Sequence, residues 1–389
     1  MRTIKKSDKK SSHIIEIVSC IIFFGFFIIF ALITIFKPKE TFSELENKSL
    51  ERKPKLSAKT WFDRTYTDKL EKYVADHFSG RVGWLELKSG IETAAGKKEI
   101  GGIYVLKDRL IEKVTEPDYS DVDKSITAIN EFSKENDIPV YTMLVPTSAE
   151  FYKDELSYFY PELDQRSFID YVYSGLDDDI TKIDVYDVLN SHKNEYIYYR
   201  TDHHWTSLGA YYAYAAAGEK IGYVPHELSY YDVEHASDSF KGTFYSKTLN
   251  TSVKDDTMDY YHDPDGDKPM TVEVTQVFGS EPEVSDSIYY RDYLDVKDKY
   301  ASFLGTNAPI VNIKTGNEGG KLLVIKDSYA HCYAQFLTDH YSEITLIDMR
   351  YIQISYKKII DVSDYDEALV LYNVSSFAGD TDLKKLLYS

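Results

Sequence analysis

The hydrophobic pattern of the chain begins with an uninterrupted apolar run near the N-terminus. Residues 17–36 carry no charge, and as a helix rising about 1.5 Å per residue they would cross a hydrocarbon core of about 30 Å. A secretory signal would have an apolar region of roughly half that length and a small-residue cleavage site, whereas this run ends in "ITIFKPKE". The pattern predicts an uncleaved transmembrane anchor at residues 14–36, preceded by a basic tail at residues 1–13.

The charge on either side of this anchor predicts its orientation. Residues 1–10 contain five lysines or arginines and one aspartate, whereas the whole chain has a formal net charge of -19. Positively charged flanks stay in the cytoplasm. We therefore expect a single-pass cell-membrane protein whose N-terminus is cytoplasmic and whose body is extracellular.

After the anchor, a polar spacer is followed by a segment with helical spacing. Residues 37–60 are charged and poor in large apolar side chains, which is typical of a juxtamembrane spacer. Residues 61–115 form the next predicted segment: helical spacing to about residue 100, then a hairpin whose apolar runs flank Lys107 and Asp108.

From residue 116 to residue 389 the pattern alternates between helices and short apolar runs. The predicted strands are rich in Val, Ile and Leu, and they are "IPVYTMLVP", "ITKIDVYDV", "GKLLVIKDS", "EITLIDMR" and "DEALVLYNV". Continuous apolar strands separated by helices indicate a mostly parallel sheet covered on both faces. We predict an α/β fold, a three-layer α/β/α domain, interrupted by a polar insertion at about residues 220–300.

Composition excludes some function classes. The acidic balance and the sequence pI of about 5.0 exclude nucleic acid as a partner, because binding to phosphates depends on Lys and Arg. The chain has two cysteines, Cys20 in the predicted anchor and Cys332 in the body, so it has no disulfide framework. We expect Cys332 to be a small buried residue, since no basic cluster favours a thiolate.

Ser328 lies where a catalytic nucleophile would be placed in such a sheet. In "KLLVIKDSYAHCYAQFL" a strand over residues 321–326 is followed at once by a helix that Ser328 opens. Working residues of open α/β sheets lie at the carboxyl ends of strands, and a helix N-terminus offers amides to a developing oxyanion. A serine in this position could also simply cap the helix.

The stretch "RTDHHWTS" contains a candidate base and its partner. Asp202 and His204 are two residues apart, so in an extended segment they point to the same side, and His203 points to the other. Asp202 would orient His204, and His204 would accept the proton of Ser328. The sequence thus predicts a Ser-His-Asp triad.

The same stretch could also form a metal site or a purely structural helix entry. Asp-His-His could supply metal ligands, but the chain has no H-E-x-x-H motif, and "HELSY" at His226 lacks its last histidine. As a helix entry, the segment would be capped by Thr201 or Thr206. We favour the triad, with no metal and no cofactor.

The motif "TDHHWTSLGAYYAY" resembles the signature of the DHHW family of bacterial surface proteins. That family is similar to the SGNH-hydrolase-like proteins that O-acetylate alginate and other exported polysaccharides. The resemblance extends to "SELENKSLERKPKLS", "KKEIGGIYV", "LVPTSAEFY", "FKGTFYSKT", "FLGTNAPIVNIKTG" and "DMRY". It implies an SGNH-hydrolase-like domain in which Asp202, His204 and Ser328 are catalytic.

The order of these motifs is reversed relative to ordinary SGNH hydrolases, as in a circular permutation, and Lys326 stands where a glycine would be. For the oxyanion hole we nominate the Ser328 amide with Gly305 and Asn307, although "LGTN" also suits a turn. Arg350 and Tyr351 follow a predicted strand and are substrate candidates. An ion pair with a nearby acid is the alternative role of Arg350.

These observations lead to a membrane-anchored extracellular serine acyltransferase or esterase acting on O-acetyl groups. Its expected partner is a cell-surface polysaccharide or other glycopolymer, and the 35 tyrosines suit sugar packing. A membrane-bound acyltransferase that supplies acyl groups is a further compatible partner. The alternatives are a non-catalytic glycan-binding or assembly protein of a surface-polymer biosynthesis complex and a structural protein that uses only the fold.

Overall fold

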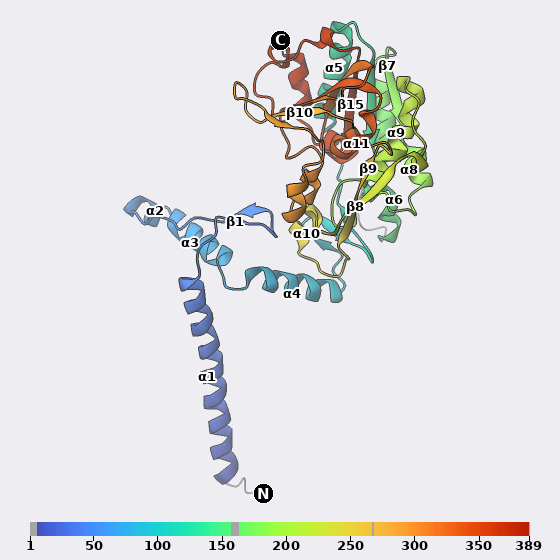
Figure 1. The fold of residues 1–389 in the computed structure, drawn as a ribbon. Helices are drawn as coiled ribbons and strands as arrows, with labels where there is room; N and C mark the ends of the chain where they lie inside the picture. Colours follow the sequence, from blue (N-terminus) through green and yellow to red (C-terminus); the bar gives the residue numbers. More distant parts are fainter. Residues whose placement is uncertain (1–5, 157–162, 267, 389) are drawn as a thin grey trace. The chain divides into compact units, whose positions relative to one another are not determined.

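The computed structural model describes residues 6–156, 163–266 and 268–388 (Figure 1). The chain divides into two compact units, Met1–Ala95 and Gly96–Ser389.

The first unit is helical. Its α1 (Lys6–Phe36) contains a stretch, His13–Phe36, of mean hydropathy 2.9 that is long and apolar enough to cross a membrane, which fits the predicted anchor. Short strands β1 (Phe42–Ser43) and β2 (Lys48–Ser49) pair antiparallel. Three helices follow: α2 (Ala58–Phe62), α3 (Thr65–Asp76) and α4 (Arg81–Ala94).

The second unit is built on an eight-stranded sheet of order β11-β10-β12-β14-β13-β15-β6-β7. Its five parallel strands are the five predicted ones: β6 (Val140–Val145), β7 (Ile180–Asp184), β13 (Gly320–Lys326), β14 (Tyr341–Ile347) and β15 (Glu367–Asn373). Three antiparallel strands extend one edge: β10 (Thr271–Thr275), β11 (Glu283–Ser285) and β12 (Ile310–Lys314). The mostly parallel α/β sheet is therefore confirmed.

Helices cover both faces of this sheet. Successive residues of β13 enter different cores: Leu322 and Val324 pack on one side, Leu323 and Ile325 on the other. The first core includes residues of α8 (Tyr186–Ser191), α9 (Ser207–Ile221) and α11 (Ala330–Leu337). The second includes residues of α5 (Tyr119–Glu135), α7 (Gln165–Gly175) and α12 (Val374–Ala378). This alternation produces the three-layer architecture.

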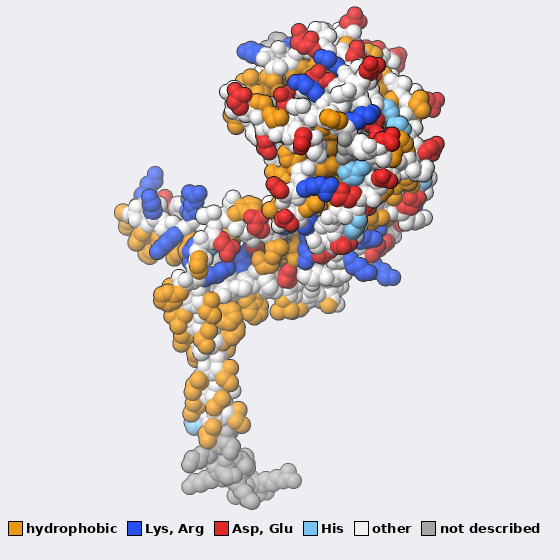
Figure 2. All heavy atoms as spheres, viewed as in Figure 1, with side chains coloured by type: hydrophobic (Ala, Val, Ile, Leu, Met, Phe, Trp, Pro, Cys, Tyr) orange, Lys and Arg blue, Asp and Glu red, His pale blue; other side chains and the backbone are white. Residues whose placement is uncertain are grey.

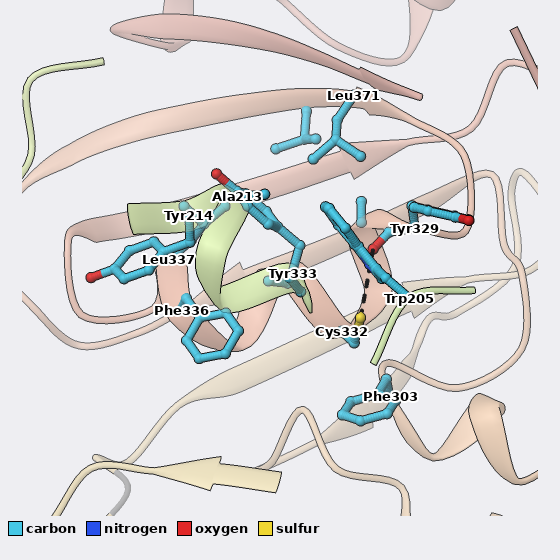
Figure 3. Close-up of a cluster of buried hydrophobic side chains, with 14 of the residues drawn as sticks. Trp205, Ala213, Tyr214, Phe303, Tyr329, Cys332, Tyr333, Phe336, Leu337 and Leu371 are labelled. Atoms are coloured by element: carbon cyan, nitrogen blue, oxygen red, sulfur yellow. Dashed lines mark hydrogen bonds between the residues drawn. The ribbon is translucent and has the colours of Figure 1, made fainter. Parts of the chain in front are cut away.

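The first core is rich in aromatic side chains. Trp205 and Tyr333 stack with ring centroids 5.9 Å apart, and Cys332 and Leu371 belong to the same buried cluster (Figure 3). Because Trp205 follows His204 and Cys332 follows Ser328 by four residues, this cluster joins the two segments that carry the predicted triad.

A small sheet accompanies the main one. Strands β3 (Glu99–Ile100), β4 (Ile103–Val105) and β5 (Leu110–Glu112) pair antiparallel. The amide of Leu106 donates to the carbonyl of Arg109 at 3.0 Å, so the hairpin turns at Lys107 and Asp108, where the sequence predicts it.

The predicted insertion at about residues 220–300 is more ordered than its polar composition suggests. Strands β8 (Asp232–Phe240) and β9 (Asp256–His262) form a ladder of their own, and β10 and β11 join the main sheet. Alternate residues of β9 are buried, with Met258 and Tyr260 in the first core. Between β8 and β9 lies α10 (Thr243–Thr248), which reaches the site described next.

Candidate active site

Ser328 lies in a tight turn between β13 and α11. The preceding Asp327 is fully buried and fixes this turn, because its carboxylate accepts hydrogen bonds from the amide of Tyr329 (2.8 Å) and from the amide and side chain of Asn373 (2.9 and 2.6 Å). Among the described residues, the Ser328 amide has no acceptor. It is therefore free to donate to a developing oxyanion, as proposed from the sequence.

The segment Asp202–Trp205 forms the opposite wall of the site. Tyr198 and Trp205 form an isolated antiparallel bridge, and Thr206 caps α9 by accepting from the Gly209 amide at 3.3 Å. The indole of Trp205 donates to the carbonyl of Tyr329 at 3.1 Å. The helix cap is thus present, and the indole hydrogen bond holds the histidine loop against the serine turn.

The structure brings Asp202, His204 and Ser328 together in one hydrogen-bonded chain. The Ser328 Oγ lies 2.7 Å from His204 Nε2, and His204 Nδ1 lies 2.5 Å from Asp202 Oδ1. The exposed fractions fall along the chain, from 9% at Ser328 to 5% at His204 and 2% at Asp202. This is the geometry of a nucleophile, a base and the group that orients the base.

Asp202 is held on its other side by α10, which the sequence analysis did not include in the site. Its Oδ2 accepts from the amide and the hydroxyl of Thr243, both at 2.7 Å. A Cβ on Gly242 would lie 2.2 Å from the Cβ of Asp202, so only glycine allows this approach. Gly242 and Thr243 lie in "FKGTFYSKT", one of the segments that carry the family resemblance.

The charges within the site favour a neutral His204 beside an ionised Asp202. Burial opposes ionisation of Asp202, but the charges and hydrogen bonds of His203 and His204 hold its pKa well below the usual range. Burial also opposes protonation of His203, yet Asp202 outweighs it and raises the His203 pKa. Burial and the positive charge of His203 lower the pKa of His204 to about 4. His204 can therefore accept a proton at neutral pH.

Tyr300, in the 3-10 turn Lys299–Ser302, is a second residue that sequence reasoning missed. Its ring stacks on His204 at 3.6 Å with an interplanar angle of 9°. Its hydroxyl donates to the carbonyl of Ser328 at 3.0 Å. Tyr300 thus contacts both the base and the serine turn.

The other predicted site residues lie outside this hydrogen-bonded chain. Gly305 has a positive φ of 78°, which fits a turn. In the part of the chain that the structure describes, the side-chain oxygen of Asn307 is buried without a hydrogen-bond partner. Within the described residues, neither Gly305 nor Asn307 makes a hydrogen bond to Ser328, so their role as oxyanion donors stays a prediction.

Arg350 makes an ion pair, which is the alternative role expected for it from the sequence. Its guanidinium donates to both carboxylate oxygens of Asp348, at 2.8 and 2.6 Å. Tyr351 is exposed, and its ring centroid lies 5.6 Å from the Arg350 guanidinium. Asp348 also lies 3.4 Å from the fully buried amine of Lys326, whose other neighbour is His331 Nε2 at 2.8 Å. The lysine that replaces a glycine therefore belongs to a buried charged network behind the serine turn.

The thiol of Cys332 behaves as a packed side chain. It is fully buried, and burial raises its pKa to about 12. The Tyr300 hydroxyl lies 3.4 Å from its sulfur. The structure therefore places a neutral thiol in the core, as the sequence predicts.

Asp202, His203 and His204 also satisfy the spacing of a metal site. One potential ligand atom of each lies within 4.8 Å of the others. Both ring nitrogens of His204 are, however, engaged by Asp202 and Ser328. A metal at this position would have to displace one of these hydrogen bonds, so the geometry suits the serine site better.

Known proteins share both the sequence motif and the fold. The family model described as DHHW protein matches residues 88–347. A solved DHHW family protein from Eubacterium siraeum is 29% identical over 74% of this chain and 96% of its own, with a TM-score of 0.64. Bacillus cereus PatB1, solved with a sulfonyl adduct, is 20% identical over 73% of this chain and 97% of its own, with a TM-score of 0.62. A search of curated proteins found no match.

Proposed function

The chain belongs to the DHHW family, and we propose that it is a membrane-anchored extracellular serine acyltransferase or esterase acting on O-acetyl groups of a cell-surface polysaccharide. The observation that carries this proposal is the hydrogen-bonded chain from Asp202 through His204 to Ser328. The resemblance to polysaccharide O-acetylation proteins supports the choice of substrate.

In the first half-reaction Ser328 Oγ attacks the carbonyl carbon of an acetyl ester, and its proton passes to His204 Nε2. Asp202 stabilises the imidazolium that forms, and the uncommitted Ser328 amide donates to the oxyanion. When the tetrahedral intermediate collapses, His204 returns the proton to the departing alkoxide. The acetyl group is then an ester of Ser328.

In the second half-reaction His204 removes a proton from the acceptor hydroxyl, which attacks the acetyl-serine. Ser328 leaves with the proton that His204 gives back. With water as acceptor the reaction is ester hydrolysis, and with a sugar hydroxyl it is transfer. The same three residues serve both outcomes.

The proposed organisation places this chemistry outside the cell. We assign residues 1–13 to the cytoplasm and residues 14–36 to the membrane, followed by a spacer at 37–60, a helical and hairpin segment at 61–115, and a catalytic domain at 116–389. The apolar stretch His13–Phe36 and the basic residues before it support this topology.

The proposal can be tested on the full-length protein in detergent. We expect hydrolysis of a chromogenic acetyl ester and, with an oligosaccharide present, a product heavier by one acetyl group. A sulfonyl fluoride should block both reactions by modifying Ser328, by analogy with the sulfonyl adduct of PatB1. Absence of ester turnover, together with oligosaccharide binding, would favour the non-catalytic alternative.

A further inference from the structure

A cavity of about 180 Å³ lies beside the triad. Its wall includes His203 and Thr243, which both contact Asp202, and Asn373, which binds Asp327. The rest of the wall comes from Glu112 at the end of β5, from the segments that follow β6 and β15, and from α10. The cavity therefore adjoins residues that contact Asp202 and Asp327, although Ser328 and His204 are not part of its wall.

Half of the residues in this wall carry a hydroxyl group, and Glu112 and Lys247 add one charge of each sign. The hydroxyl groups belong to Thr147, Ser148, Thr243, Ser375 and Ser376. Ser148 is 2% exposed, and its hydroxyl has no hydrogen-bond partner within the described part of the chain. Thr147 Oγ1 accepts from Gln165 Nε2 at 2.7 Å, which leaves its own proton available. Such groups match a ligand with many hydroxyls.

The size of the cavity suits one sugar ring. A cavity of about 150 Å³ holds a six-membered aromatic ring, so the cavity beside the triad has room for a ring with small substituents. A second cavity of about 300 Å³ shares Glu112 and Ser375 with the first. The two cavities therefore adjoin each other, and we refer to them together as the groove.

The charge of the second cavity discriminates between polymers. Its wall carries five carboxylates and one lysine, Lys113: the carboxylates belong to Glu112, Glu116, Asp118, Asp121 and Asp380. A polyanionic chain would be repelled by this wall. A neutral chain would not.

We propose that this groove binds a neutral, hydroxyl-rich glycan and that the first cavity holds the sugar whose O-acetyl group is made or cleaved. The acetyl chemistry rests on the function proposed above, but the binding does not. The groove thus distinguishes this chain from a protein that acts on an acidic, uronate-type polymer.

Binding is best measured on the full chain carrying Ser328→Ala, which needs no catalysis. Calorimetric titration would use a neutral gluco-oligosaccharide and an oligo-uronate of equal length. We expect the uronate to bind at least about 10-fold more weakly. In the same background Ser375→Tyr should fill the groove and weaken binding of the neutral ligand by about 10-fold or more, and Ser375→Ala by a few-fold.

Ser174→Tyr is the matched control, because Ser174 is an exposed serine on α7 outside the groove, and it should leave binding unchanged. Equal binding of the uronate, or unchanged binding in both Ser375 variants, would overturn the proposal. A missing esterase activity in the wild-type protein would instead count against the proposed function and leave the binding result standing.

A second, independent observation concerns the first unit. Helix α4 exposes Trp84, Leu87 and Ile91, with exposed fractions of 44%, 53% and 60%. Their spacing of three and four residues places them on one face of the helix. Figure 2 shows hydrophobic side chains gathered along α4 and α1. An apolar stripe of this kind is unusual on a surface that meets only water.

This stripe is joined to the end of the membrane-spanning helix. Phe30 of α1 stacks on Phe78, with ring centroids 5.8 Å apart, and lies 6.2 Å from the ring of Trp84. The amide of Ser79 donates to Thr34 Oγ1 at 3.1 Å. Phe30 precedes the end of α1 by six residues, or about 9 Å along a helix. With α1 spanning the membrane as proposed above, these contacts place the start of α4 near the membrane interface.

We infer that α4 lies in the outer membrane interface with its apolar face among the lipid chains. Tryptophan is favoured at this depth, and amphipathic helices bury their apolar face about 5–10 Å into the headgroup boundary. The charged residues of α4 balance in sign, two basic and two acidic: Arg81, Lys88, Glu86 and Glu92. Binding is therefore due to apolar burial rather than attraction to anionic lipids.

The test uses tryptophan fluorescence of the full chain in phosphatidylcholine vesicles with or without brominated acyl chains. In the wild-type protein we expect brominated lipid to quench part of the tryptophan fluorescence. In Trp84→Phe the amount of fluorescence lost to brominated lipid should be smaller by more than about half. The matched control is Trp61→Phe, which removes another exposed tryptophan of the same unit and should keep the Trp84 signal. Unchanged quenching in Trp84→Phe, or quenching of Trp84 by aqueous acrylamide alone, would overturn the inference.

Discussion

Asp202, His204 and Ser328 are joined end to end, so substitutions at these residues should not have independent effects. We expect Ser328→Ala, His204→Ala and the double variant to lose similar amounts of kcat/KM on an acetyl ester, roughly 10⁴- to 10⁶-fold. Asp202→Asn should lose somewhat less, about 10⁴-fold, because it spoils the imidazole tautomer and leaves the base in place. Additive losses in the double variant would mean that the two residues do not act as a unit.

The pKa of His204 sets the acid limb of the activity profile. The imidazole must be neutral to accept the serine proton, so activity is present above its pKa and is lost as the pH falls through about 4. In His203→Gln the neighbouring positive charge is gone, and the pKa of His204 should rise toward its ordinary value. In a plot of log kcat/KM against pH, the acid limb is therefore expected to shift to higher pH. An acid limb that stays in place would show that His203 does not act on the base.

The sequence is sufficient to predict a site residue only where the role of that residue follows from local spacing. The strand-to-helix position of Ser328 and the pairing of Asp202 with His204 could be read from the sequence. The predicted position of His203 was wrong, because residues 201–204 form bends rather than an extended segment, and His203 Nδ1 lies 3.4 Å from Asp202 Oδ1 instead of pointing away. Thr243 and Tyr300 could not be read from the sequence, because they reach the triad through contacts with residues 41 and 96 positions away: Thr243 with Asp202 and Tyr300 with His204. One tyrosine among the 35 in the chain carries no local signal.

At the scale of elements, α10 must approach the histidine loop closely. A Cβ at Gly242 would lie 2.4 Å from Asp202 Oδ2, so Gly242→Ala should push Asp202 away from His204. We expect a loss of about 10²-fold or more in kcat/KM and a lower melting temperature. Gly90→Ala on α4 of the first unit is the control, since its Cβ would meet no described atom within 4 Å beyond the backbone of its own helix. Equal activity in the two variants would contradict the positioning role of α10.

Four of the five parallel strands, β6, β13, β14 and β15, were predictable because both of their faces are largely buried, which gives long apolar runs. The fifth, β7, lies at an edge of the sheet and is only partly buried. The strands β8 to β11 were not predictable, because β8 and β11 are largely exposed, β9 and β10 are only partly buried, and the region is rich in acidic side chains. The parallel strands place Ser328 at the carboxyl end of β13, in the middle of the sheet. The missed region brings Thr243, which completes the support of Asp202.

At the scale of the whole molecule, the proposed topology makes the body accessible from outside the cell. A protease added to intact cells is expected to remove the catalytic domain and to leave a fragment that contains α1. An epitope tag at the N-terminus should stay protected under the same conditions, because the basic tail is cytoplasmic. Protection of the body in cells with an intact envelope would contradict this topology.

The central claim is that Ser328 carries the acyl group. The most direct measurement is the mass of the peptide that contains Ser328 after the full-length protein is mixed with excess acetyl ester and quenched in acid. We predict the mass of one acetyl group on this peptide, and no such addition in His204→Ala. Turnover of the ester by Ser328→Ala, with loss of activity on chelation, would contradict the claim and favour a metal held by Asp202, His203 and His204.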